Sequence, residues 1–205
     1  MDCVSKKMVD VHQELVVNTY AELWHGAQLL REKASIDEKG PTFVFMASLC
    51  MFAFSVEAYT NFVGPKLFPN EWFREDKPYE RYPILKKIRK ICKVLGLTIK
   101  ENGPQWALLY ALVQFRDTLA HGKQETVVKR ELVPLKAEPT DYLSGRLSPA
   151  IHQYCNVAYV QQVELEVGGF LSAIHEALQA RNEDEYLGPF GSLGMGHGSA
   201  TLVEY

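Results

Sequence analysis

The sequence predicts an all-α protein in which about five main helices form a bundle within one domain. Apolar residues recur at spacings of three and four along most of the chain, which is the period of an amphipathic helix. Short polar segments containing Gly and Pro divide this pattern into five stretches. A length of 205 residues, of which 47% are hydrophobic, allows one substantial core. We expect a single domain over residues 1–187 and a glycine-rich tail over residues 188–205.

The first helix is expected over about residues 6–34. Its apolar positions follow helical spacing: Met8, Val11, Leu15, Val16, Tyr20, Leu23, Trp24, Ala27 and Leu30. Residues 35–41 form a polar break. Pro41 suits the start of the next helix, because its missing N–H would have no helical partner there.

One segment resembles a membrane span, and we assign it to a second helix over about residues 42–62. Residues 43–56 are apolar apart from two serines. A membrane-spanning helix needs about 20 predominantly apolar residues, and the carboxylate of Glu57 would be costly in lipid. The sequence therefore predicts a buried central helix that ends at the Gly-Pro pair of residues 64–65, and no membrane partner.

A connecting loop over residues 65–82 leads to two further helices. In residues 83–95 the apolar positions are four, three and four residues apart, and basic residues fill most of the rest: Ile84, Ile88, Ile91 and Leu95. This third helix is expected to end near Gly96. Pro104 opens a fourth helix that reaches His121, and Gly122 is expected to form a left-handed cap after it.

The region between the fourth and fifth helices predicts a small irregular or β-hairpin insertion over about residues 124–155. It begins with weak alternation and continues with many Pro, Gly, Ser and Thr residues. Helical spacing returns over about residues 156–180, although Gly168 and Gly169 each weaken a helix by roughly 1 kcal/mol relative to alanine. The closely spaced glycines after residue 188 predict a loosely held terminus.

Charge and cysteine usage limit the function classes. The formal net charge of -3 argues against a protein that coats duplex nucleic acid or an anionic membrane through bulk charge, so contact with nucleic acid must be local. The cysteines form no CxxC pair, which favours a reducing compartment: Cys3, Cys50, Cys92 and Cys155. The N-terminal residues lack the pattern of a secretory signal, so we expect a cytoplasmic protein.

One short segment carries residues suited to chemistry, and it lies at the end of the fourth helix. It reads Arg116-Asp-Thr-Leu-Ala-His121. Asp117 and His121 are four residues apart on one helix face, so the acid is a candidate to orient the imidazole. A histidine in the last helical turn also lies at the negative end of the helix dipole, which favours its protonated form. Such a histidine is suited to proton transfer near neutral pH.

An arginine beside a proton-exchanging histidine suits phosphodiester cleavage without a metal. Arg116 would stabilise charge on the phosphate in the transition state, and His121 would move a proton to or from an oxygen. The histidines show no metal-ligand spacing such as HxxxH, so we expect no metal, and nothing indicates a cofactor. The spacing of Arg116 and His121 occurs by chance about 0.23 times in a chain of this composition. On spacing alone, a surface arginine and a capping histidine are the favoured interpretation.

In its helical context, this segment resembles the HEPN superfamily (higher eukaryotes and prokaryotes nucleotide-binding). That family carries an Arg, a polar residue and a His after four to six intervening residues, as residues 116–121 do here. The preceding central helix, with its Ser55-Val-Glu57-Ala-Tyr-Thr-Asn61-Phe stretch, is also similar. The resemblance covers residues 6–122 and the last helix.

The resemblance implies a HEPN-like bundle that forms a homodimer, in which two Arg-His motifs face one composite cleft. Many such proteins are metal-independent endoribonucleases of toxin, defence or RNA-processing systems that leave 2',3'-cyclic phosphate ends, and some have an antitoxin or effector partner. It gives Arg116 and His121 the catalytic roles, places Asp117 at the polar position and makes Glu57 a brace from the central helix. One subgroup has a tyrosine target for nucleotidylation where this chain has Lys123, so that regulation is not assigned.

Further candidates for phosphate or RNA contact lie outside the motif. Lys86, Lys90 and Lys93 share one side of the third helix and are candidates to follow a phosphate backbone, as is Lys123 directly after the motif. The alternative for the three helical lysines is a solvated face opposite the isoleucines. Trp72, in the connecting loop, is a candidate to stack on a base, whereas the other two tryptophans lie in apolar helical patterns typical of a core.

Two alternatives to a ribonuclease stay open at this level. One is a non-catalytic HEPN-like dimeric module that binds a nucleotide or a protein partner, in which Arg116 would still bind a phosphate. The other is a helical dimer without a ligand, in which the motif only caps a helix and bridges subunits.

Overall fold

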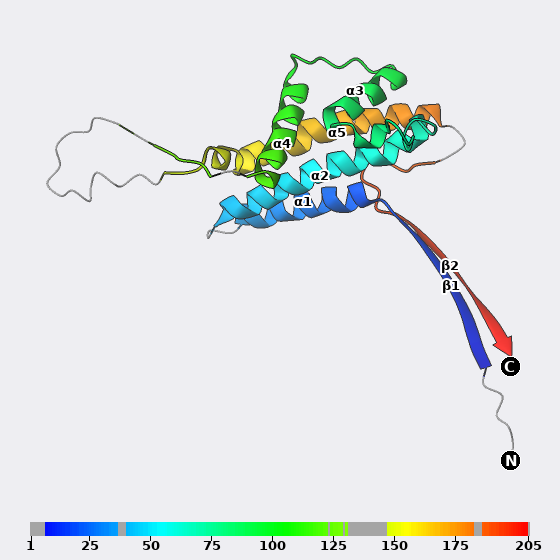
Figure 1. The fold of residues 1–205 in the computed structure, drawn as a ribbon. Coiled ribbons are helices and arrows are strands. Elements are labelled where there is room, and N and C mark those ends of the chain that lie inside the picture. The colour runs from blue at the N-terminus through cyan, green and yellow to red at the C-terminus, as the bar shows by residue number, and fades with distance from the viewer. Residues whose placement is uncertain are drawn as a thin grey trace.

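A computed structural model describes residues 7–36, 40–122, 124–128, 130, 147–182 and 186–204. In this part of the chain, five α-helices form a bundle: α1 (Thr19–Ile36), α2 (Pro41–Leu67), α3 (Ile84–Leu95), α4 (Pro104–Ala120) and α5 (Val157–Arg181). Two short 3-10 helices, η1 (Tyr79–Arg81) and η3 (Ala150–Tyr154), precede α3 and α5. Strands β1 (Lys7–Val17) and β2 (Gly194–Glu204) form an antiparallel ribbon that projects from the bundle (Figure 1). The prediction of an all-α bundle with five main helices is confirmed.

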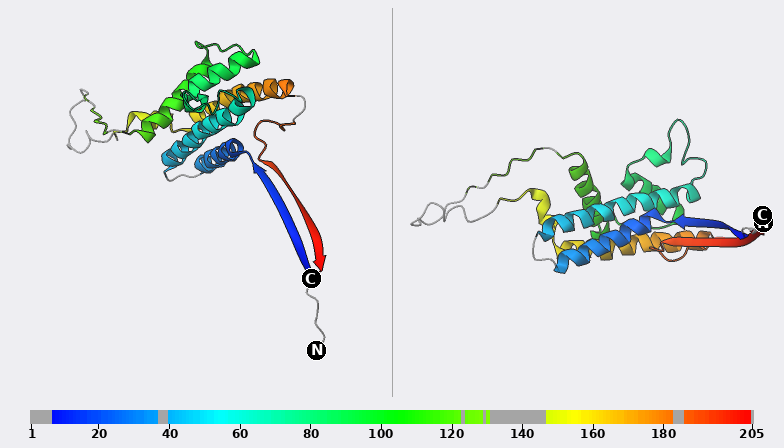
Figure 2. Two further views of the ribbon diagram at one scale, coloured as in Figure 1. Left: turned by 45° about the vertical axis from the view of Figure 1, so that its right-hand side comes forward. Right: turned by 90° about the horizontal axis from the view of Figure 1, so that it is seen from below.

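Helix α2 is the centre of the bundle and contacts all four other helices (Figure 2). Its buried side chains include Leu49, Phe52, Val56, Tyr59 and Val63. Among the described helices, α2 is long and apolar enough by length and composition to cross a membrane. In this fold the same apolar residues pack against neighbouring helices, as expected for a central helix.

The prediction that Gly64 and Pro65 end the second helix was wrong, because α2 continues to Leu67. Pro65 has no N–H, so the helix loses one backbone hydrogen bond there. The helical hydrogen bonding continues beyond it, and the N–H of Phe68, directly after the helix, donates to the Gly64 carbonyl at 2.9 Å. Gly64 serves packing instead. A Cβ at this position would lie 2.1 Å from the Trp72 ring.

Trp72 is therefore part of the core and not a platform for a base. Its side chain is only 2% exposed, which contradicts the idea that this loop tryptophan stacks on nucleic acid. Trp24 and Trp106 are also buried, as their helical patterns predict. In the sequence, Trp72 stands among Pro, charged and aromatic residues, which is typical of a surface loop. Its contact with Gly64 of α2 buries it instead.

Residues 7–17 form a strand, so the prediction that the first helix begins near residue 6 was wrong; α1 begins at Thr19. The apolar residues of this segment fit spacings of three and four, but they also alternate, and four of the eleven residues are valines, which favour a strand. The deciding interaction is distant in sequence. β1 pairs with β2 in a register that runs from Lys7↔Glu204 to Val17↔Gly194.

The same pairing corrects the prediction of a loosely held C-terminal tail. Residues 194–204 are paired along their length, and the segment before them is anchored on the bundle. The ring of Phe190 lies among three core rings, with centroid distances of 5.7 Å to Tyr20, 5.4 Å to Trp24 and 5.3 Å to Tyr59. The carbonyl of Gly188 accepts a hydrogen bond from His175 Nε2 at 2.9 Å.

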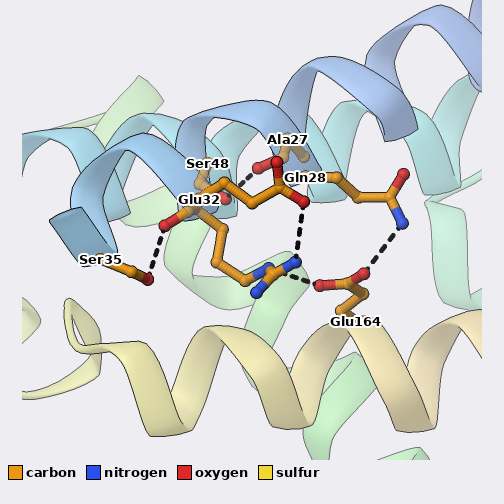
Figure 3. Close-up of polar contacts among 7 residues, drawn as sticks. Ala27, Gln28, Glu32, Ser35, Ser48 and Glu164 are labelled. Carbon is orange, nitrogen blue, oxygen red and sulfur yellow. Dashed lines mark hydrogen bonds and ion pairs between the residues drawn. The ribbon is translucent and has the colours of Figure 1, made fainter.

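Polar contacts fix α1 against α2 and α5 (Figure 3). Glu164 of α5 accepts a hydrogen bond from Gln28 Nε2 at 2.8 Å and forms an ion pair with Arg31 Nε at 2.7 Å. Ser48 of α2 donates to the Ala27 carbonyl at 2.7 Å. These contacts set the position of α1 along two neighbours, so the bundle core does not depend on apolar packing alone.

The predicted insertion is only partly described. Residues 124–128, 130 and 147–149 have no regular secondary structure, and η3 lies in its C-terminal part. Residues 131–146, where part of the suggested hairpin falls, lie outside the described residues. Among the described residues, the small β element of this fold is instead the ribbon formed by the two ends of the chain.

Candidate functional site

Arg116 lies near the end of α4 and is held by two carboxylates from two helices. Its Nη2 contacts Glu57 Oε2 of α2 at 2.5 Å, and its Nη1 contacts Asp117 Oδ1 at 2.8 Å. The Arg116 side chain is 17% exposed, whereas those of Glu57 and Asp117 are 39% and 40% exposed. The guanidinium is thus largely enclosed, and both carboxylates are open to solvent.

The packing of α2 on α4 explains why Glu57 reaches Arg116. Val56 of α2 and Phe115 of α4 are buried inside the bundle. The residues that follow them, Glu57 and Arg116, lie at the margin of this buried region. There the carboxylate of Glu57 and the guanidinium of Arg116 meet across the two helices. The hydrogen bond gives the only acidic residue of the central stretch a partner, which a partly buried carboxylate requires.

Two further side chains of α2 surround the guanidinium. Its central carbon lies 5.8 Å from the centroid of the Phe54 ring, within range of a cation–π contact. Burial raises the pKa of Cys50, and the positive charge of Arg116 opposes part of this increase. Arg116 therefore lies against Phe54 and Glu57, which are three residues apart on α2.

The guanidinium keeps hydrogen-bonding capacity beyond these two partners. Arginine has five N–H donors in a fixed plane. Glu57 and Asp117 use one donor each, and the Nε of Arg116 is buried without a hydrogen-bond partner among the described residues. The chain thus fixes a positive charge in one orientation and leaves part of its donor set unused.

His121 is the residue directly after α4, and it is exposed. Its backbone N–H donates to the Asp117 carbonyl at 3.0 Å. Within the part of the chain that the structure describes, the imidazole makes no hydrogen bond or ion pair. The carboxylate of Asp117 binds Arg116, so the expectation that Asp117 orients the His121 ring was wrong.

The helix end also differs from the expected left-handed glycine cap. Gly122 does not have a positive φ, and its N–H donates to the Leu119 carbonyl at 3.4 Å. His121 itself leaves the helical conformation, with φ of -112° and ψ of 25°. A glycine is therefore not needed here for a left-handed turn. By contrast, α3 ends at Gly96 as expected, and Gly96 has a φ of 71°, which makes it a left-handed cap.

The basic side of α3 is mostly engaged with tyrosine rings. Lys86 Nζ lies 3.6 Å from the Tyr82 centroid, and Lys90 Nζ lies 4.1 Å from the Tyr79 centroid. Lys93 is exposed, and Lys123 lies outside the described residues. The isoleucines of α3 are buried on the opposite side, as the alternative of a solvated basic face requires.

One lysine of α3 is a site residue that sequence analysis missed. Lys87 is only 3% exposed, and its Nζ donates to Asn61 Oδ1 of α2 at 2.8 Å. Burial lowers the pKa of Lys87, while the negative charges of Glu57 and Glu80 oppose this decrease. The sequence carries only part of the signal, because Glu57 and Asn61 are four residues apart on one face of an otherwise apolar helix, but nothing there selects Lys87 among the basic residues of α3. Through these contacts, Asn61 of α2 binds Lys87 of α3, and Glu57 of α2 binds Arg116 of α4.

The cluster around Arg116 lies where α2 meets α4, and both of its carboxylates are partly exposed. Three cavities of about 410, 480 and 450 Å³ lie elsewhere, against Trp106, His175 and Tyr186 respectively. Among the described residues, no group of three His, Cys, Asp or Glu side chains is placed to hold a metal ion.

Comparisons of the chain with protein-family models, with curated proteins and with solved structures gave no match. The function must therefore be argued from the geometry of the cluster and from the chemistry of its side chains.

Proposed function

We propose that this protein is a HEPN-like, metal-independent endoribonuclease of the toxin, defence or RNA-processing type. It would act in the cytoplasm as a homodimer on single-stranded RNA, with or without an antitoxin or effector partner. The observation that carries the proposal is the fixed position of Arg116, which Glu57 of the central helix holds five residues before an exposed histidine. An oriented, permanent cation beside a titratable group is what cleavage of a phosphodiester without a metal needs.

In the proposed reaction the RNA supplies its own nucleophile. The 2'-oxygen forms a bond to phosphorus while the bond from phosphorus to the 5'-oxygen breaks, which gives a 2',3'-cyclic phosphate and a free 5'-hydroxyl. A base takes the proton of the 2'-hydroxyl, and an acid gives a proton to the leaving 5'-oxygen. The remaining Nη N–H donors of Arg116 would stabilise the charge on the phosphate oxygens, whereas its Nε is buried. In a composite cleft, the His121 residues of two subunits would serve as base and acid.

Exposed aromatic residues beside the cluster support a dimer at this surface. Phe54, whose ring lies near Arg116, is 44% exposed, and Tyr110 is 51% exposed. Tyr110 precedes Asp117 by seven residues, or about two helical turns, so the two share a face of α4. Exposed aromatic residues next to polar groups are typical of interaction surfaces.

The test is cleavage of labelled structured and unstructured RNAs in excess EDTA, with analysis of the product ends. We expect cyclic-phosphate ends from the wild type and a loss of at least about 100-fold in rate for Arg116→Ala and His121→Ala. Arg74→Ala and His12→Ala are matched controls, since both residues are exposed and lie outside the cluster. Full activity in a pure, folded His121→Ala protein would remove that residue from the mechanism.

The second candidate is a non-catalytic dimeric module that binds a nucleotide or a protein partner. The two carboxylates favour it, because Glu57 and Asp117 neutralise the Arg116 charge and lower its attraction for an RNA backbone. In this case no RNA of a broad panel is cleaved. Nucleotide binding, measured by calorimetry, would then be lost in Arg116→Ala and retained in His121→Ala.

A further inference from the structure

Along residues 9–15 of β1 and their partners in β2, the ribbon has one apolar face and one polar face. Directly paired residues of antiparallel strands lie on the same face, and faces alternate along each strand. The observed register puts these pairs on one face: Val9↔Leu202, Val11↔Ala200, Gln13↔Gly198, Leu15↔Gly196 and Val17↔Gly194. The other face carries Asp10↔Thr201, His12↔Ser199 and Glu14↔His197 between the apolar pairs Met8↔Val203 and Val16↔Met195, and the charged pair Lys7↔Glu204 lies at the far end of the first face. Between residues 9 and 17 every charged residue is on this second face.

Among the described residues, the β1 side of the apolar face is left exposed. Val9, Val11, Leu15 and Val17 are 53%, 58%, 70% and 49% exposed. The ribbon extends away from the helices in every view, so the bundle does not back it (Figures 1 and 2). Alternation such as that of residues 9–12 is typical of a strand with one packed face, and an isolated two-stranded ribbon is only marginally stable in water. The pattern therefore indicates a surface that becomes buried.

We propose that the apolar face of the ribbon packs against the same face of a second copy of this chain. The face is complementary to itself. Its β2 side presents glycines at 194, 196 and 198, beside the larger residues of β1. A two-fold axis parallel to the strands would place β1 of each copy over the glycine strip of the other. The same axis brings the two Gln13 residues to one level, where an amide both donates and accepts hydrogen bonds.

The size and charge of the apolar face fit a second copy of this chain. Two strands of 11 residues offer on the order of 500 Å² per copy, or about 1,000 Å² in total, which is where specific interfaces begin. Asp10 and Glu14 lie on the outer face, and the Lys7↔Glu204 pair lies at the end of the packed face, so between residues 9 and 17 no charge has to be buried. A nucleic acid would need a basic face, which neither side of β1 between residues 9 and 17 provides.

The proposal does not depend on ribonuclease activity, and its test uses the full chain. Val11→Lys puts a charge on the apolar face, and His12→Lys puts the same charge on the polar face one residue away. Sedimentation velocity is measured at tens of micromolar protein and after serial dilution. We expect Val11→Lys to halve the mass of the largest species and to raise the dissociation constant at least about 100-fold, whereas His12→Lys leaves both unchanged.

Folding of the variants is checked separately. The far-UV circular dichroism of both should match the wild type, since the helices do not pack on the ribbon. Amide exchange of wild-type residues 9–17 should be slower above the dissociation constant than below it. A wild type that stays monomeric would overturn the proposal. So would a Val11→Lys protein that keeps the full wild-type mass. Loss of RNA cleavage with intact self-association would reject only the proposed function.

Discussion

At the scale of single residues, the contact between Glu57 and Arg116 is more enclosed than the exposed ion pairs of Arg74 and Arg89, and it resembles the pair of Arg31 and Glu164, whose side chains are 18% and 23% exposed. Arg116 is 17% exposed, whereas both partners of the Arg89 and Glu101 pair are open to water, at 46% and 56%. Exposed pairs contribute about 0 to 1 kcal/mol, because water and salt screen them. An enclosed guanidinium that loses a partner keeps the cost of its desolvation.

Glu57→Ala should therefore lower the free energy of unfolding by about 1 to 2 kcal/mol, since Arg116 Nη2 would lose its partner while Asp117 still holds Nη1. The measurement is urea denaturation of the mutant beside Glu101→Ala. The control should change stability by less than about 0.5 kcal/mol. Equal losses in the two variants would show that the Glu57 contact is no stronger than a surface ion pair.

His175 links the core to the C-terminal segment through both ring nitrogens. Nε2 lies beside a carbonyl and must carry the proton that it donates to Gly188, so Nδ1 accepts from the Tyr59 hydroxyl at 3.2 Å. Burial lowers the pKa of His175, although the Gly188 hydrogen bond and the charge of Glu176 oppose this decrease. The folded protein thus binds a proton at His175 less readily than the unfolded chain does.

Stability should consequently fall as the pH drops below about 6.5, the ordinary histidine pKa, because the unfolded state takes up the proton first. Above that pH both states carry a neutral ring and the His175 contribution is constant. Thermal unfolding between neutral and mildly acidic pH measures the slope. His175→Gln should flatten it, and His12→Gln, on the exposed ribbon, should not. A slope unchanged by His175→Gln would assign the pH dependence to other groups.

At the scale of elements, two adjacent glycines of α5 give a direct comparison of helix propensity and packing. A Cβ on Gly168 would lie 2.8 Å from the Trp24 ring, whereas a Cβ on Gly169 would meet nothing within 4 Å. Gly169→Ala should stabilise the protein by up to about 1 kcal/mol through helix propensity. Gly168→Ala should destabilise it by about 1 to 3 kcal/mol, because the buried indole must move. Thermal unfolding of both variants should show opposite signs; two stabilising substitutions would mean that Trp24 has room to shift.

The spacing of apolar residues predicted the elements that have a long apolar stripe or whose packing partners lie close in the sequence. The ranges of α3, α4 and α5 follow from it within a few residues, because each buries one apolar stripe against the bundle. It failed for residues 7–17, where the short apolar pattern fits either period and the decisive partner begins at residue 194. It also failed at Gly64, since a glycine demanded by a tertiary contact looks like one that ends a helix.

Some features of the candidate site were likewise predicted from the sequence, and others depend on packing that the sequence does not reveal. The sequence brought out Arg116, His121 and Glu57, because each is a polar residue at an unusual place in an apolar pattern. It did not reveal that Asp117 turns to Arg116 and not to His121, because both residues are within its reach on a helix. The burial of Lys87 also could not be read from its position among five basic residues, since only the packing of α3 on α2 selects one of them.

At the scale of the whole molecule, α2 joins the core to the polar surface. One side carries the buried apolar residues that contact the other helices, and its margin carries Glu57 and Asn61, which bind α4 and α3. The orientation of Arg116 is therefore coupled to the packing of the entire bundle. Changes that shift α2, such as enlarging Gly64 against Trp72, are expected to act on the Arg116 cluster from a distance.

The pairing of β1 with β2 also has a consequence for the order of folding. β1 is synthesised before the helices, and its partner strand follows all of them. Joining segments so far apart has a high loop-closure entropy cost unless the helical bundle has first brought them together. A growing chain therefore carries β1 without its partner until nearly all of the helices have been made. During that interval its valine-rich edge is open to pairing with other nascent chains, and a chaperone that binds extended apolar segments would find its first target there.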